Sequence, residues 1–347
     1  MQAASLSNSG SIQLNLGSTL QVSGDVSNSG TIATANSEFG GHYFGNTVNI
    51  AGKLTNGTGG TFSLGSVNDA ANIGYISNAG TILLATGTNL NVNGGSHAAT
   101  NALPGFLNTG TVDISSGGTL ASPLTYTQTS GQTTVDGTLR VSSRGTINLA
   151  GGSVYGDEGT IQGTIVSNAA INIGDSPLTI GQLAFNGNFT QGANGSLTFD
   201  IAGPASGQYD QLNVSGHAQL NGLMTVDLLH GYVPQIGNNF DIMNFASESG
   251  MFSMVVGLPI NGQEHFVLEY NSTNLMLDVV QGQLSGQPAA SGTSPASEPF
   301  ITISQEADGY SLTASNNGTP SPTPEPGSIL LFGSGAIAVA GRLRRRW

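Results

Sequence analysis

A short phrase recurs along the first third of the chain and constrains the fold more than any other feature. It consists of Asn, small residues, Gly, Ser or Thr, and then Ile, Val or Phe, as in NSGSI, NSGTI, NGTGGTF, NAGTI and NTGTV. Its glycines are separated by steps of 20, 30, 20 and 30 residues, at Gly10, Gly30, Gly60, Gly80 and Gly110. Units of this length with little apolar content predict a β-solenoid, whose coils bury apolar residues against their neighbours. We expect the repeated Asn and Gly at its corners, since both tolerate a positive φ.

The residues between these phrases favour strands over helices. The chain of 347 residues contains 52 glycines, and Gly, Asn, Ser and Thr all disfavour a helix interior. Apolar residues alternate with small polar ones in GSIQLNLGSTLQV and GTLRVSSRGTINL, which is the period of a half-buried strand. We therefore expect an all-β chain, with a parallel solenoid of about six to eight coils over residues 1–176. A low-complexity Gly, Ser and Asn segment is the alternative.

The composition changes near residue 177. The stretch 177–280 holds seven of the thirteen Phe and five of the six Met, so it can build a thicker core than the repeats. We expect a β-rich domain that caps the solenoid. Its phrases YDQLNVSG at 209–216, LNGLMTVDL and GNNFDI at 237–242 resemble the module near the C-terminal end of autotransporter-like passengers and related bacterial surface proteins. This resemblance implies a surface location and no particular activity.

Residues 281–323 follow this domain and are rich in Ser, Gly, Pro, Ala and Thr. That composition predicts a linker. Within the linker, FITISQEADGYSLTA predicts a small hairpin that turns at Asp308 and Gly309.

The C-terminal segment, 324–347, combines three physical parts in a fixed order. A rigid Pro324-Glu325-Pro326 precedes an apolar run over 327–341, and four arginines follow, at Arg342, Arg344, Arg345 and Arg346. A helix over that run would span about 22 Å, less than the roughly 30 Å of a bilayer's hydrocarbon core. We therefore predict a short, transient transmembrane helix, with the arginines as stop-transfer charges on the cytoplasmic side.

This order resembles the PEP-CTERM sorting signal of Gram-negative bacteria, although Thr323 stands where that family often has Val. The resemblance implies that Pro324, Glu325 and Pro326 are recognised by an exosortase-type membrane protease. It also implies transient anchoring in the inner membrane, removal of the tail, and release to the cell surface or extracellular matrix. The opening MQAASLSNSGSIQLNLG lacks a basic and apolar export leader, so we expect the true N-terminus to lie upstream.

Few side chains suggest catalysis. The phrase FGGHYFGN places His42 near Glu38 and Tyr43 in sequence, and YGDEG pairs Asp157 with Glu158. Adjacent strand residues point to opposite faces, so the second pair would need a turn in order to act together. We expect solvated loops at both places, no catalytic residue, no metal ion and no cofactor.

The residues that follow the repeat glycines form a candidate surface ladder, which consists of Ser11, Thr31, Thr61, Thr81 and Thr111. Flat threonine ladders on solenoids are one way in which proteins bind ice. Thr is also a favourable solvent-facing strand residue in its own right. The uneven spacing and the lack of a repeated Thr-x-Thr favour this simpler interpretation.

The charge balance limits the partners. The formal net charge is -13, and without the four terminal arginines residues 1–341 carry twenty acidic and three basic residues, a net charge of -17. Nucleic acid is excluded, because phosphate binding needs clustered Lys and Arg. We expect an exported, non-catalytic scaffold or adhesin of the cell surface or exopolysaccharide matrix, which binds a neutral glycan or associates with an anionic one through a cation. The alternatives are a β-helix polysaccharide hydrolase or lyase and an ice-binding protein.

Overall fold

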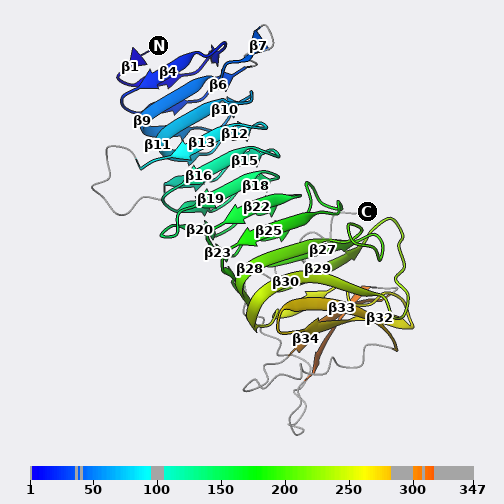
Figure 1. Cartoon of the computed structure of the whole chain (residues 1–347). Coiled ribbons are helices and arrows are strands. Elements are labelled where there is room, and N and C mark those ends of the chain that lie inside the picture. The colour runs from blue at the N-terminus through cyan, green and yellow to red at the C-terminus, as the bar shows by residue number, and fades with distance from the viewer. Residues whose placement is uncertain are drawn as a thin grey trace.

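The computed structural model describes residues 2–35, 38–39, 42–94, 105–282, 300–306 and 309–315. Every element in these ranges is a β-strand, and the strands stack as successive coils from the N-terminal end of the molecule towards β33 (Figure 1). The predicted all-β fold with a parallel β-solenoid is confirmed. The Pro-Glu-Pro motif, the predicted helix over 327–341 and the arginine cluster lie outside the described residues.

Each coil runs through three faces, which we number in chain order. The first face contains β1 and β4, the N-terminal parts of four long strands, and five shorter strands. Its strands are β1 (Gln2–Ala3), β4 (Thr19–Val22), β9 (Thr47–Asn56), β11 (Ala70–Asn78), β13 (Asn89–Val92), β16 (Thr119–Ser122), β19 (Thr138–Val141), β22 (Gly159–Gln162), β25 (Gln182–Asn186), β28 (Gln211–Leu220) and β30 (Asn239–Gly250).

The second face is continuous with the first, because β9, β11, β28 and β30 run through the corner between them. Both faces therefore belong to one 20-stranded sheet. The remaining strands of the second face are β2 (Leu6–Asn8), β5 (Val26–Asn28), β14 (Phe106–Asn108), β17 (Tyr126–Gln128), β20 (Thr146–Leu149), β23 (Thr164–Ser167) and β26 (Phe189–Gln191).

The third face is a separate sheet of 11 parallel strands, one from each coil. These strands are β3 (Ser11–Leu14), β6 (Thr31–Thr34), β10 (Thr61–Leu64), β12 (Thr81–Leu84), β15 (Thr111–Ile114), β18 (Gln132–Val135), β21 (Ser153–Tyr155), β24 (Ala170–Asn172), β27 (Ser196–Ile201), β29 (Leu223–Leu228) and β31 (Met254–Val256). Inward residues stack in register between coils, as Ile32, Phe62 and Ile82 do. Alternation with period two thus gives one continuous core along the solenoid.

The repeat glycines do not have the conformation expected of them. Gly10, Gly30, Gly60, Gly80 and Gly110 lie at the corner between the second and third faces, as expected, but none has a positive φ, so the conformational reason is wrong. Their role is to permit close stacking. A Cβ on Gly80 would lie 2.2 Å from the carbonyl oxygen of Gly60, and one on Gly110 would lie 2.2 Å from that of Gly80. The coils approach so closely at this column that only glycine fits.

Both sheets continue across residue 177, where the sequence predicts a domain boundary. Strand β24 pairs in parallel with β27, and β22 pairs in parallel with β25. Fully buried aromatic side chains become more frequent in the core here. Phe62, Phe106 and Tyr126 precede residue 177, and the larger group that follows it includes Phe185, Phe189, Phe199, Phe240 and Phe266.

The C-terminal end of the stack is closed by antiparallel strands. β32 (Glu264–Tyr270) pairs with β33 (Asn274–Gln281), and β33 pairs antiparallel with β30. Two further hairpins are described: β7 (Glu38–Phe39) with β8 (His42–Tyr43), and β34 (Phe300–Glu306) with β35 (Gly309–Ser315). The second is the hairpin predicted within the linker.

Candidate functional surface

The asparagines of the repeat phrase form a ladder inside the solenoid. Asn8, Asn28, Asn56, Asn78, Asn108 and Gln128 are all buried. The Nδ2 of Asn28 donates to Oδ1 of Asn56 at 2.8 Å, and Nδ2 of Asn56 donates to Oδ1 of Asn78 at 2.8 Å. These side-chain amides also form hydrogen bonds with the backbone; for example, Nδ2 of Asn78 donates to the carbonyl of Thr111 at 2.9 Å. The repeated Asn thus fixes the register of successive coils and offers nothing to a ligand.

Asp69 is a second buried polar group with a structural role. It is fully buried, and its Oδ1 accepts from the backbone N–H of Asn46 at 2.7 Å and from Asn46 Nδ2 at 3.0 Å. Its Oδ2 accepts from the backbone N–H of Ser66 at 2.9 Å and from the hydroxyl of Thr34. A buried carboxylate with four donors anchors this corner and has no spare capacity for chemistry.

The predicted surface ladder lies on the third face. Ser11, Thr31, Thr61, Thr81 and Thr111 are paired in register on consecutive strands. The next outward column on this face is chemically mixed and consists of Gln13, Ala33, Ser63, Leu83 and Asp113. A functional role for the threonine column stays a prediction.

The first face carries an outward ladder of amides that sequence reasoning missed. Nδ2 of Asn49 donates to Oε1 of Gln21 at 3.1 Å, and Nδ2 of Asn72 donates to Oδ1 of Asn49 at 2.9 Å. Nδ2 of Asn91 continues the series to Oδ1 of Asn72 at 3.3 Å. The available signal was an Asn or Gln directly before the last apolar residue in TLQV, TVNI, AANI and NLNV. That signal becomes visible only once the uneven repeat is aligned.

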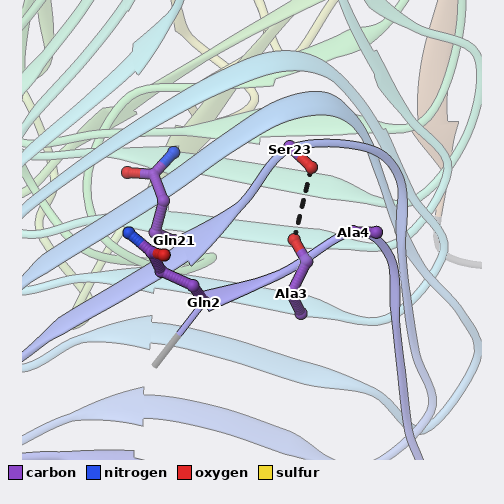
Figure 2. A pocket seen from close by; sticks show the side chains of 5 residues that line it. All are labelled: Gln2, Ala3, Ala4, Gln21 and Ser23. Atoms are coloured by element: carbon purple, nitrogen blue, oxygen red, sulfur yellow. Dashed lines mark hydrogen bonds between the residues drawn. The ribbon is translucent and has the colours of Figure 1, made fainter.

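A hollow of about 420 Å³ lies at the N-terminal end of this amide ladder. Gln2, Ala3, Ala4, Gln21 and Ser23 line it (Figure 2). Gln2 is the register partner of Gln21, and the two side chains project from the same side of their strands (Figure 2). The hydroxyl of Ser23 donates to the carbonyl of Ala3 at 3.4 Å.

A carboxylate-rich corner runs beside the third face. Burial raises the pKa of Asp136 to about 6; the N–H of Asp157 lowers it, and the neighbouring carboxylates of Asp175 and Asp113 raise it. Asp157 belongs to the predicted Asp157-Glu158 pair, which lies at a turn where Glu158 has a φ of 55°. Its Oδ1 accepts the backbone N–H of Gln182 at 3.0 Å. The Asp157 carboxylate therefore supports the next coil.

Asp200 and Asp210 are the most deeply buried carboxylates of this corner. Oδ1 of Asp210 accepts from the N–H of Gly181 at 2.8 Å, and its Oδ2 accepts from the N–H of Asp200 at 2.8 Å. Burial nevertheless raises the pKa of Asp210 to about 8. Burial, and then the carboxylate of Asp227, raise the pKa of Asp200 to about 6.

The remaining candidate residues from the sequence lie on the hairpin formed by β7 and β8. His42 is exposed on β8, and the side chains of Glu38 and Tyr43 lie outside the described set. Within the described ranges, no group of three or more His, Asp or Glu side chains is arranged to hold a metal ion. None of the described elements is a helix of the length and apolarity needed to cross a membrane.

Comparison with known families identifies the tail. Residues 322–346 match the PEP-CTERM protein-sorting motif. This span includes Pro324, Glu325 and Pro326 and all four arginines of the cluster. The motif defines an exported protein that is processed by exosortase, a membrane enzyme, and directed to the cell surface. No curated protein matches the chain.

Proposed function

We propose that this protein is a non-catalytic scaffold or adhesin of the cell surface or the extracellular polysaccharide matrix. The sorting motif over residues 322–346 carries the proposal, because it accounts for export. The solenoid supplies a long lateral surface on which polar groups repeat once per coil. Such a surface suits many weak contacts with a polymer.

The carboxylates support a structural role over catalysis. The pKa of Asp210 and the pKa of Asp200 are raised in a way that would suit an acid catalyst. However, both oxygens of Asp210 accept backbone N–H groups from the preceding coil. These contacts favour a packing role over that of a glycan hydrolase.

The third face likewise favours the scaffold over ice binding. Its threonine column is flanked by a column that contains Leu83 and Asp113. An ice surface would be more complementary to a flat, uniform array of side chains than to this mixed one.

Co-sedimentation of the exported protein with the host's own extracellular polysaccharide tests the proposal, with and without calcium. The release of reducing ends is followed in the same samples. We expect the protein to sediment with the polysaccharide without new reducing ends. New reducing ends would identify an enzyme, and the absence of protein from the pellet in both conditions would overturn the matrix role.

A further inference from the structure

The first face of the N-terminal coils carries polar groups in a fixed, repeating geometry. Its ladder consists of Gln21, Asn49, Asn72 and Asn91, and Gln2 is the register partner of Gln21 at the N-terminal end. Adjacent members lie on adjacent strands, so the amides repeat at about 4.8 Å along the axis. Their mutual hydrogen bonds hold them in one orientation before any ligand arrives.

The ladder has spare hydrogen-bonding capacity. A carboxamide offers two N–H donors and two acceptor lone pairs. Asn49 and Asn72 each use one N–H and one lone pair for their ladder neighbours. One donor and one acceptor per amide remain, and these side chains are half-buried on the outer surface.

In the first-face parts of β4, β9, β11 and β13, the outward positions carry no charge. The exposed Asp25 and Lys53 lie at the corner with the second face, where the backbone N–H of Lys53 donates to Oδ1 of Asp25 at 2.8 Å. The other outward column there consists of Thr19, Thr47, Ala70 and Asn89. The nearest described acidic residue in sequence, Asp69, is buried against its own donors. The first charged residue in the amide column is Arg140, on β19. The amide ladder itself therefore gives an anionic polymer no counter-charge.

We propose that this amide ladder, from Gln21 to Asn91, binds an uncharged polysaccharide chain that lies along the solenoid axis. Hydroxyl groups both donate and accept, so they match the donor and acceptor left on each amide. A preorganised ladder loses little conformational entropy on binding.

The other faces suit such a chain less well. The outward column of the second face offers only single hydroxyls in these coils, from Ser7, Ser27, Thr55 and Ser77. The third face leads into the carboxylates that begin at Asp113. This inference rests on the proposed function and names the ligand class and the surface that bind.

Native affinity electrophoresis of the exported protein tests the proposal. The gels contain hydroxyethyl cellulose or galactomannan, which are neutral, or alginate, which is anionic. We expect the neutral gels to retard the wild-type protein and the alginate gel not to retard it. The N49A/N72A variant should bind at least about tenfold more weakly, because it loses the hydrogen bonds of two amides. The S27A/S77A variant on the second face is the matched control and should keep wild-type retardation.

Three other outcomes would contradict the proposed binding surface or the proposed ligand class. Undiminished retardation of N49A/N72A would show that the ladder is not the binding surface, even if the host polysaccharide still sediments with the protein. Equal retardation by alginate, or none by either neutral polymer, would overturn the ligand class. If the N49A/N72A variant has a lower melting temperature than the wild type, the test uses Asn91→Ala at the end of the ladder instead. Asn91→Ala breaks only one ladder hydrogen bond, and it must still weaken binding.

Discussion

The coils before and after residue 177 stack in the same way but bury different side chains between them. In the N-terminal coils, the side chains from Asn8 to Gln128 form an unbroken buried polar ladder. It lies beside a mostly aliphatic core that also contains the fully buried Phe62, Phe106 and Tyr126. The hydrogen-bonded series ends at Leu149, the register partner of Gln128, and the buried Ser167 and Gln191 follow in the same column. Among the described residues, one aromatic ring contact, Phe106 with Tyr126, lies before residue 177, and three lie after it, such as Phe185 with Phe189 at 5.0 Å between ring centroids.

This difference shows how register is specified in a solenoid. Small aliphatic side chains pack almost equally well when a strand slips by two residues, whereas a hydrogen-bonded amide ladder does not. Large aromatic side chains fill specific spaces and impose register through shape. The buried polar ladder therefore lies in the coils whose apolar side chains specify the register least.

The largest expected effect is on the glycine column of the N-terminal coils. Gly80→Ala places a Cβ 2.2 Å from the carbonyl oxygen of Gly60, so the coils must move apart. We expect a loss of about 4 kcal/mol or more in the free energy of unfolding, measured by denaturant titration. Gly10→Ala is the matched control, because a Cβ there meets nothing within 4 Å. Equal stability of the two variants would show that close stacking does not require this column.

The next effect concerns the aromatic core. Phe189 is fully buried against Phe185, so Phe189→Ala leaves a cavity in the C-terminal coils. We expect a loss of about 3 to 5 kcal/mol by the same titration. Thr190→Ala, on the outer surface of the same strand, should stay within about 0.5 kcal/mol of the wild type. A small effect at Phe189 would remove the proposed contrast between the two regions.

Substitutions in the buried polar ladder from Asn8 to Gln128 should reduce the stability somewhat less. Asn78→Ala removes one hydrogen bond each from Nδ2 of Asn56, Oδ1 of Asn108 and the carbonyl of Thr111. We expect a loss of about 2 to 4 kcal/mol in the free energy of unfolding, because three hydrogen bonds to buried polar groups are lost at once. Ser77→Ala, the outward neighbour on β11, is the control and should be close to neutral. If both variants are equally stable, the ladder does not hold the coils in register.

The pH dependence should come mainly from the carboxylate-rich corner. The pKa of Asp210 is raised to about 8, and the pKa values of Asp200 and Asp136 are raised to about 6, above the value of 3.8 for an ordinary Asp. The folded state therefore holds more protons than the unfolded state between about pH 4 and pH 8, and stability must fall as pH rises through that window. Denaturant titrations at pH 5 and pH 8.5 should show higher stability at pH 5. Asp210→Asn should reduce the difference, and higher wild-type stability at pH 8.5 would contradict the account.

The sequence was sufficient to predict the fold and the tail. The recurring Gly-Thr-Ile phrase and the two-residue alternation specify stacked parallel strands, because these patterns depend only on local chemistry. The tail was predictable because its motif, apolar run and arginines are contiguous in the chain.

The roles of the repeat residues could not be predicted from the sequence. Whether Gly80 needs an unusual φ or merely a small volume depends on the distance to Gly60, which is set by stacking. The ladder of Gln21, Asn49 and Asn72 joins residues separated by 28 and 23 positions, so the uneven coil lengths hide it. The raised pKa of Asp210 likewise follows from burial, which the sequence does not reveal.

The central claim is that the tail is a sorting signal on an exported surface protein. Intact mass spectrometry tests this claim most directly. The protein is recovered from the surface or medium of a host with the matching sorting machinery. The account predicts a mature chain that ends near Pro324-Glu325-Pro326 and lacks Arg342 to Trp347. Recovery of a chain that still ends at Trp347 would contradict it.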